Sequence, residues 1–154
     1  MQRVVVLGRG GAGKSTAARQ LGERTGLPVI ELDQIFWRPG PTATPRNDWI
    51  ERQRELCTAQ RWIMDGDLGP YDALDERLVR ADTVLIFDFS LVRCTWRALR
   101  RSRERADFWW WLLTWRRYYR PAILAAVTTF APDATVRVLR TPRDLRRFLA
   151  ATPP

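Results

Sequence analysis

Five short, mostly apolar runs recur along the chain, and each predicts a β-strand. They cover residues 4–7, 29–32, 62–64, 83–87 and 136–139. The first run, Val4-Val5-Val6-Leu7, is continuous rather than alternating, which is typical of a strand buried on both faces. The pattern therefore predicts strands that lie inside a layered structure.

The segments between these runs predict helices, over about 14–24, 49–60, 72–80, 92–105, 108–127 and 142–150. Thr25-Gly26 ends the first, Asn47 or Asp48 caps the second, and Pro142 suits the first turn of the last. Pro121 predicts a kink or a break in the fifth helix. Prolines and a glycine predict a loop over residues 37–45.

Strands that alternate with helices indicate an α/β fold, with one parallel sheet, helices on both of its faces and right-handed crossovers. No repeat or linker divides the chain, so we expect a single domain over residues 1–154. Ligands bind such sheets at the carboxyl ends of the strands, which directs the search for chemistry to the residues that follow each strand.

Aromatic residues are concentrated in the fifth predicted helix. A stripe at helical spacing is formed by Phe108, Trp111, Leu112 and Trp115. Packing against the core is the favoured interpretation of this stripe. Trp109 and Trp110 then face partly outward, in a dimer contact or in a lid that packs over a bound ligand.

Composition narrows the classes of function. The chain contains no histidine, which excludes Ser-His-Asp chemistry and most zinc sites. Cys57 and Cys94 are isolated and lack metal-type spacing, no apolar run is long enough to span a bilayer, and the N-terminus enters a strand at once. We therefore expect a cytoplasmic protein without a membrane partner. The formal net charge of +9 comes from arginine, since Lys14 is the sole lysine; GC-rich coding accounts for such a bias, so the positions of the arginines matter more than their number.

A glycine-rich motif follows the first predicted strand. Residues 8–16 read Gly-Arg-Gly-Gly-Ala-Gly-Lys-Ser-Thr, a complete match to the phosphate-binding pattern G-x-x-x-x-G-K-[ST]. The expected nucleotide contacts are Gly8, Arg9, Gly10, Gly11, Ala12, Gly13, Lys14, Ser15 and Thr16. Lys14 would reach the β and γ phosphates and the Ser15 hydroxyl would bind Mg²⁺. The alternative is a turn that binds nothing, but the strand before it and the helix after it favour the phosphate site.

Three of the later strands end at an aspartate: Asp33, Asp65 and Asp88. Phosphoryl transfer needs carboxylates to hold Mg²⁺ and to orient the attacking hydroxyl. We assign Asp65 to the metal together with Ser15, and Asp33 to the acceptor, against the alternative that both only cap turns. Asp88 follows a pattern that any apolar strand ending in Asp would match, so it is left open.

Arginines crowd the helix after the fourth strand. Arg93, Arg97 and Arg101 recur at intervals of four residues and share one face. Guanidinium groups stabilise the charge on a transferring phosphoryl group, and we select Arg97 and Arg101 for this role and Arg117 for the substrate. A solvated basic face accounts for most of the other arginines. Trp37, just past Asp33, either stacks on a substrate ring or anchors its loop.

The order of these motifs resembles adenylate-kinase-like P-loop kinases, and most closely the bacterial topology modulation, or FlaR-like, proteins. The matching stretches are the glycine-rich loop, residues 31–40, residues 62–67, residues 80–88, the arginine-rich helix and residues 138–143. The resemblance implies a three-layer fold with a five-stranded sheet in the order 2-3-1-4-5, an acceptor-binding insert at about 34–61 and a helical lid at about 93–127. It also implies ATP as donor, with Thr141, Pro142 and Arg143 near the adenine, and acidic roles for Asp33 and Asp65-Gly66.

The segment after the third strand departs from that family. Adenylate kinases carry an arginine after Asp-Gly that grips the acceptor phosphate, whereas this chain reads Asp65-Gly66-Asp67-Leu68-Gly69-Pro70. Asp67 would lie by the substrate and repel a phosphate. Residues 105–108 also join the two lid helices directly, where the FlaR-like pattern has a longer lid. Among nucleoside, nucleotide, sugar and cyclitol acceptors, an acceptor with a free hydroxyl therefore gains weight over a nucleotide.

These observations support an ATP- and Mg²⁺-dependent small-molecule kinase as the first hypothesis. A nucleic-acid-directed kinase or binder that uses the basic, aromatic-rich region is the second. A nucleotide-sensing switch without turnover is the third. A homodimer is compatible with all three.

Overall fold

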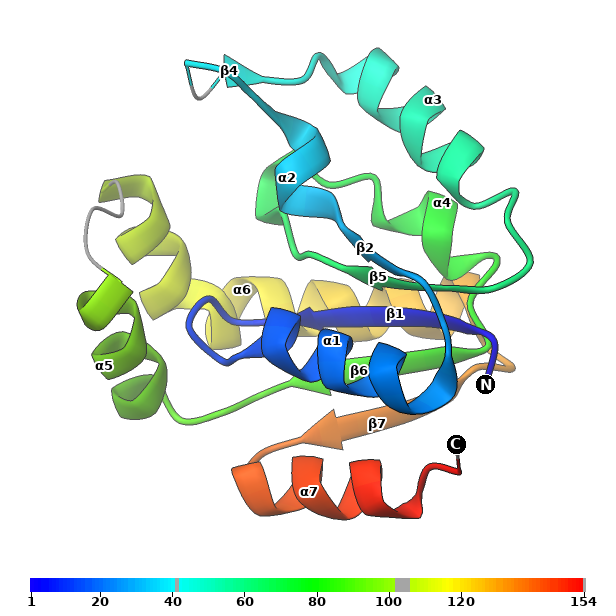
Figure 1. Cartoon of the computed structure of the whole chain (residues 1–154). Helices are drawn as coiled ribbons and strands as arrows, with labels where there is room; N and C mark the ends of the chain where they lie inside the picture. Colours follow the sequence, from blue (N-terminus) through cyan, green and yellow to red (C-terminus); the bar gives the residue numbers. More distant parts are fainter. Residues whose placement is uncertain (41, 102–105, 154) are drawn as a thin grey trace.

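A computed structural model of the chain describes residues 1–40, 42–101 and 106–153, without the side chains of residues 101, 106 and 107. Its centre is a five-stranded sheet in the order β2-β5-β1-β6-β7 (Figure 1). The strands are β1 (Arg3–Gly8), β2 (Val29–Glu31), β5 (Trp62–Asp65), β6 (Thr83–Phe87) and β7 (Thr135–Leu139). All neighbouring pairs are parallel. When the five strands of this sheet are numbered along the chain, their order is 2-3-1-4-5, as predicted.

Helices cover both faces of this sheet (Figure 1). They are α1 (Lys14–Thr25), α2 (Leu32–Phe36), α3 (Arg46–Leu56), α4 (Leu74–Leu78), α5 (Leu91–Arg101), α6 (Ala106–Phe130) and α7 (Pro142–Ala151), with a 3₁₀ turn, η1, at Gly69–Tyr71. Within the described residues, no helix combines the length and the apolar character needed to cross a membrane.

The alternation of side chains along β1 separates two cores. Val4 and Val6 pack with residues of α1 and α7, whereas Val5 and Leu7 pack with residues of α3, α4 and α6. Every residue of 4–7 is fully buried, as the continuous apolar run predicts. The sheet is therefore the middle layer of three.

The aromatic stripe of α6 packs largely as expected. Leu112 and Trp115 are completely buried, while Trp110 is 67% exposed. Pro121 does not break α6, which is a single helix of 25 residues, so the prediction of a break is wrong. A kink stays a prediction. Buried contacts of Ile123 and Val127 with the core stabilise the helix beyond the proline.

The region between β2 and β5 departs from the sequence-based expectations. Strand β2 ends at Glu31, so Asp33 lies in the first turn of α2 rather than at the end of a strand. A two-stranded antiparallel hairpin, β3 (Trp37–Arg38) with β4 (Thr42–Ala43), replaces part of the expected loop. Helix α3 begins at Arg46 with Pro45 as its N-cap, so the prediction of a cap at Asn47 or Asp48 is wrong. Asp48 lies instead in the first turn, where its negative charge interacts favourably with the helix dipole.

Candidate active site

The glycine-rich motif forms a loop between β1 and α1 at the carboxyl edge of the sheet. Gly11 and Gly13 have φ angles of 73° and 90°, in the left-handed region that favours glycine. Gly13 is the N-cap residue of α1 and has no side chain to cap the helix. The first amides of α1 therefore point toward the loop, as a phosphate site requires.

Lys14 lies across this loop. Its Nζ donates to the carbonyl oxygens of Gly8, at 2.6 Å, and Arg9, at 3.3 Å. The same ammonium group is 6.0 Å from the centre of the Trp111 ring. The cation is thus held above the loop by main-chain oxygens, at the place where phosphate oxygens would compete for it.

Helices α5 and α6, the predicted lid, pack against the loop. A Cβ atom at Gly11 would collide with the carbonyl oxygen of Cys94, and one at Gly10 would lie 2.6 Å from the Phe108 ring. A Cβ atom at Gly13 would lie 2.9 Å from an Nη atom of Arg97. The structure therefore brings Arg97, a predicted catalytic residue, to the start of α1. The side chain of Arg101, the other arginine selected on this helix, lies outside the described residues.

Asp65 ends β5 beside the loop and is buried. Burial raises its pKa, and the charge of Lys14 and a hydrogen bond with Ser15 act in the opposite direction. Its Oδ1 atom is buried without a hydrogen-bond partner among the described residues. An unsatisfied carboxylate oxygen beside a hydroxyl is a donor set that fits Mg²⁺. The described residues contain no group of three or more metal-ligating side chains, in keeping with an ion that takes its remaining ligands from phosphates and water.

Asp33 lies in the first turn of α2 and is exposed to solvent. The surrounding protein nevertheless raises its pKa to about 6 by desolvation; Lys14 lowers it, and the nearby carboxylates of Asp65, Asp67 and Asp72 raise it. A carboxylate with such a pKa is suited to accept a proton near neutral pH.

The carboxylate of Asp67 accepts hydrogen bonds from three other residues of the protein. Its Oδ2 accepts from the backbone N–H of Gly8 at 3.3 Å and from the indole N–H of Trp115 at 3.0 Å, and its Oδ1 accepts from Gly69 N–H at 3.3 Å. Burial raises its pKa. These contacts tie the segment after β5 to the phosphate loop and to α6. A contact of Asp67 with substrate stays a prediction.

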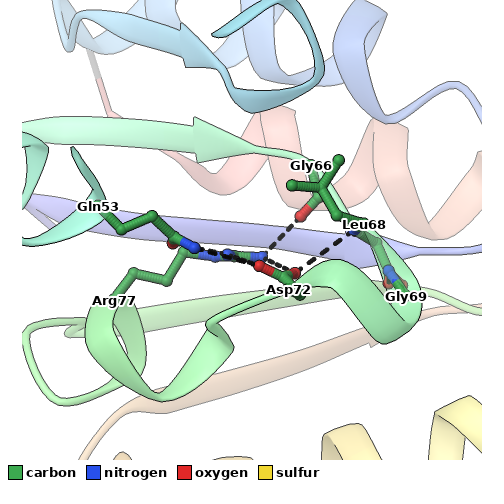
Figure 2. A network of polar contacts seen from close by, with 7 residues as sticks. Gln53, Gly66, Leu68, Gly69, Asp72 and Arg77 are labelled. Carbon is green, nitrogen blue, oxygen red and sulfur yellow. Dashed lines mark hydrogen bonds and ion pairs between the residues drawn. The ribbon is translucent and has the colours of Figure 1, made fainter. Parts of the chain in front are cut away.

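The Asp72 side chain, which is 7% exposed, pairs with Arg77 of α4 (Figure 2). Arg77 is fully buried, and its Nη atoms donate to both Asp72 oxygens at 2.6 and 2.8 Å, to Gln53 Oε1 at 2.9 Å and to the Gly66 carbonyl at 2.8 Å. Burial alone would lower the pKa of Arg77, but the pairing with Asp72 raises it. Sequence reasoning missed this network because nothing in the spacing of Gln53, Asp72 and Arg77 distinguishes them.

Asp88 pairs with two arginines of α6. Arg116 approaches Asp88 Oδ1 with Nε at 3.0 Å and Nη2 at 2.9 Å, and Arg120 Nε lies 3.1 Å from Oδ2. This carboxylate therefore links α6 to the end of β6. The spacing of four residues between Arg116 and Arg120 was the available sequence signal. Arg117 instead lies over the Tyr118 ring, 5.7 Å from its centre, on the exposed side of the helix.

Two further predicted positions lie at the edges of the site. Trp37 is 38% exposed, and its ring meets those of Phe36 and Tyr71 edge-on, with centres 4.9 and 6.0 Å apart. Thr141 caps α7 through a reciprocal capping box with Asp144. A ring contact of Trp37 and an adenine contact of residues 141–143 stay predictions.

Comparison with known proteins gives a consistent picture. No protein-family model matches the chain. The adenylate kinase of Mycobacterium leprae is 38% identical over 87 residues, which are 53% of this chain and 42% of that protein. The adenylate kinase of Mycobacterium ulcerans is 35% identical over 89 residues, 55% of this chain and 44% of that protein. The matched part thus spans less than half the length of these curated relatives.

Solved structures match the whole fold. Shikimate kinase from Acinetobacter baumannii, in complex with shikimate, superposes with a TM-score of 0.71 at 17% identity, over 97% of this chain and 89% of that one. A sugar kinase from Janibacter sp. superposes with a TM-score of 0.60 at 23% identity, over 97% and 93%. A gluconokinase from Sinorhizobium meliloti gives 0.53 at 16% identity, over 97% and 91%. The chain has the fold of these P-loop kinases.

Proposed function

We propose that this protein is an ATP-dependent kinase that transfers a phosphoryl group to a hydroxyl of a small molecule. The observation that carries the proposal is the phosphate loop, with Lys14 fixed above it and Asp65 and Asp33 both within electrostatic reach of that lysine. The partial likeness to adenylate kinases and the fold shared with shikimate and sugar kinases support it.

Each group has a distinct part in this proposal. The loop amides and Lys14 bind the β and γ phosphates, and Arg97 and Arg101 stabilise the charge on the transferring group. Ser15 and Asp65 would hold Mg²⁺, which supplies positive charge to the phosphate oxygens. The acceptor oxygen bonds to the γ phosphorus, the bond from that phosphorus to the β–γ bridging oxygen breaks, and Asp33 accepts the proton of the hydroxyl.

The charges around Asp33 favour an acceptor without a phosphate. Asp65, Asp67 and Asp72 all raise the pKa of Asp33, so the acceptor side is rich in carboxylates. Arg77, the buried cation of this region, is already paired with Asp72. A nucleoside, sugar or cyclitol fits this field better than a nucleotide does, and Trp37 and Tyr71 offer ring faces for stacking. Arg117, from the second group of arginines, and residues 141–143 by the adenine, which the resemblance to adenylate-kinase-like P-loop kinases implies, complete the proposed contacts.

Two measurements test the proposal. Calorimetry should detect binding of Mg·ATP, and ATP consumption should rise with an acceptor from a panel of matched pairs: nucleosides with their monophosphates, and sugars or cyclitols with their phosphates. The unphosphorylated member of the active pair is expected to be preferred. Absence of Mg·ATP binding would refute the kinase, and preference for the phosphorylated member would refute the acceptor class.

One surface supports nucleic acid as a second candidate partner. Trp96 on α5 is 57% exposed, and the guanidinium carbon of Arg100 lies 4.7 Å from the centre of its ring. Exposed aromatic rings beside arginines are a common platform for single-stranded nucleic acid. Binding of a single-stranded oligonucleotide that weakens steeply as salt rises would support this candidate, and the same affinity in a Trp96→Ala variant would remove it.

A further inference from the structure

Arg77 is completely buried, and burial of a guanidinium group is costly. Replacing a buried ion pair with apolar residues of similar volume is often neutral or stabilising, so stability alone does not account for this pair. The parts of the chain that Arg77 joins are more informative. They are α4, the segment after β5 and helix α3 of the acceptor insert (Figure 2).

The first link reaches the peptide between two carboxylates of the site. Gly66 lies between Asp65 and Asp67, its carbonyl accepts from Arg77 at 2.8 Å, and its N–H donates to the carbonyl of Val6 at 3.3 Å. A Cβ atom at Gly66 would lie 2.8 Å from Leu32 Cβ, so this peptide is also tightly packed. Arg77 thus holds the peptide that joins Gly66 to Asp67, one residue beyond Asp65.

The second link closes the segment 66–72 around the guanidinium. Asp72, which holds Arg77 with both oxygens, also accepts from the backbone N–H of Leu68 at 3.4 Å. The segment therefore wraps around a single cation. Loss of the planar fork would free both of its ends, because a lysine offers a point charge instead of paired donors.

The third link comes from the acceptor insert. Gln53 of α3 is completely buried; its Oε1 accepts from Arg77 at 2.9 Å, and its Nε2 donates to Asp72 Oδ1 at 3.3 Å. One turn earlier on α3, the Trp49 ring packs edge-on against Phe36, with centres 5.1 Å apart. Phe36 lies on α2, one turn after Asp33. Helix α3 therefore contacts both the element that carries Asp33 and the cation that holds the Gly66–Asp67 peptide.

We propose that Arg77 is a positioning residue which, through Gln53 and Asp72, couples the acceptor insert to the segment carrying Asp65 and sets Asp65 relative to Asp33. This inference rests on the proposed function. It predicts that the polar network supports the metal side of the site and leaves the phosphate loop itself unaffected. Partners that orient a ligand-bearing residue in this way typically change metal affinity or activity by about 10- to 100-fold when removed.

The test uses two variants and a matched control. Gln53→Met removes the amide and keeps its volume, and Arg77→Lys keeps the charge and removes the fork. The control is Arg54→Met, because Arg54 joins the same two helices through Glu76, at 2.6 and 2.9 Å, but on the surface and without contact to the segment 66–72. Thermal unfolding and circular dichroism verify that each variant is folded.

Two readouts separate positioning from general damage. Calorimetric titrations with ATP at a series of Mg²⁺ concentrations should show that Gln53→Met needs about 10-fold more Mg²⁺ for the full effect, with unchanged affinity for ATP without the metal. In the metal-free protein, hydrogen exchange should become faster over residues 66–72 in Gln53→Met and Arg77→Lys. The Arg54→Met protein should match the wild type in both measurements.

The outcomes are distinct. If the wild-type protein does not bind ATP, the proposed function fails. If it binds ATP and the folded Gln53→Met protein keeps wild-type Mg²⁺ dependence and exchange, the positioning role of Arg77 is refuted. Equal losses of affinity with and without Mg²⁺ would also refute it, since they would indicate general destabilisation. Gln53→Met leaves the Arg77–Asp72 pair in place, so it decides the matter even if Arg77→Lys does not fold.

Discussion

The phosphate loop and the segment 66–72 lie at the same edge of the sheet but are built in opposite ways. The phosphate loop takes its shape from local features: glycines with positive φ angles, and a lysine that reaches back six residues to Gly8. The segment 66–72 takes its shape from distant ones, since Asp67 meets Trp115 across 48 positions and Arg77 meets Gln53 across 24. A local motif can be recognised in a sequence, whereas a site held by distant partners has to be seen in a structure.

The two regions also differ in how their polar groups are used. In the phosphate loop, the Lys14 ammonium bonds only main-chain carbonyl oxygens among the described residues, and phosphate oxygens could replace these. In the segment 66–72, Asp67 bonds the N–H groups of Gly8, Gly69 and Trp115, and Asp72 bonds Arg77 of α4. The loop thus keeps a cation that a ligand could reach, whereas the carboxylates of the segment are used to hold its shape.

The sharpest test of the donor side is Lys14→Ala. Loss of this cation should lower phosphoryl transfer by at least ~10³-fold, as judged from other charge-stabilising groups. The measurement is ATP consumption at saturating acceptor. Arg24→Ala, a loss of positive charge at the far end of the same helix, should leave the rate unchanged; a Lys14→Ala protein within tenfold of wild type would contradict the assigned role.

Variants of two aspartates compare the buried ion pair beside the segment 66–72 with the ion pair between β6 and α6. Asp72→Asn strips its charge partner from a fully buried arginine and should cost about 3 kcal/mol or more in the free energy of unfolding. Asp88→Asn should cost about 1 kcal/mol, since the side chain of Arg116 is 56% exposed and can be solvated. Urea denaturation measures both. Equal losses in the free energy of unfolding would mean that the Arg77–Asp72 pair contributes no more to stability than the Arg116–Asp88 pair.

A pair of glycines tests the local origin of the phosphate loop. Gly11 and Gly26 have similar φ angles of 73° and 67°, but a Cβ atom at Gly11 would collide with Cys94 whereas one at Gly26 would meet nothing. Gly26→Ala should lower stability by about 1 kcal/mol from backbone strain alone. Gly11→Ala should cost about 2 kcal/mol more because of the added clash. Calorimetric unfolding compares them, and equal losses would indicate that α5 yields to the loop.

The smallest expected effect is the pH dependence on the acceptor side. Because the pKa of Asp33 is raised to about 6, the base form is lost as pH falls through that value. The ratio kcat/KM should therefore decrease about tenfold per pH unit below 6. The chain has no histidine to produce such a limb, and Asp33→Asn should abolish it.

The raised pKa of Asp33 also predicts that this residue destabilises the folded protein as pH rises, whereas activity increases with pH. A carboxyl whose pKa is higher in the folded state than in the unfolded chain binds its proton more tightly when folded, so it destabilises the protein above about pH 6 and not below about pH 4. The melting temperature of Asp33→Asn relative to wild type should therefore be higher at pH 8 than at pH 4. A constant difference would show that Asp33 titrates normally.

The contrast between local and distant contacts also explains what the sequence could predict. Strand β6 lies at residues 83–87 as predicted, because a short apolar run flanked by polar residues leaves few alternatives. Helix α1 likewise begins at Lys14 and is closed by Gly26. The short helix α2 was not predicted, since its five residues carry too little periodicity to distinguish a helix from the end of a strand.

The candidate site divides along the same line. Lys14 and Ser15 could be placed at the loop because they belong to one motif, and Asp65 could be placed beside it because it ends a neighbouring strand. Their roles stay predictions. Arg77 and Gln53 could not be placed, because a buried arginine and an exposed one look alike in a sequence when no partner is known. Asp88 could be placed at the end of its strand, but its pairing with Arg116 and Arg120 depends on how α6 crosses the sheet.

The indole ring of Trp111 lies close to both the phosphate loop and the segment 66–72. Trp111 lies 6.0 Å from Lys14, and Cβ atoms placed at Gly10 and Gly69 would lie 2.9 and 3.0 Å from its ring. Its emission should respond to a cation that leaves one set of oxygens for another, and also to any movement of the opposite wall. Trp111 thus lies where these two regions meet, and a stopped-flow comparison of the wild type with a Trp111→Phe variant would separate its emission from that of the other seven tryptophans.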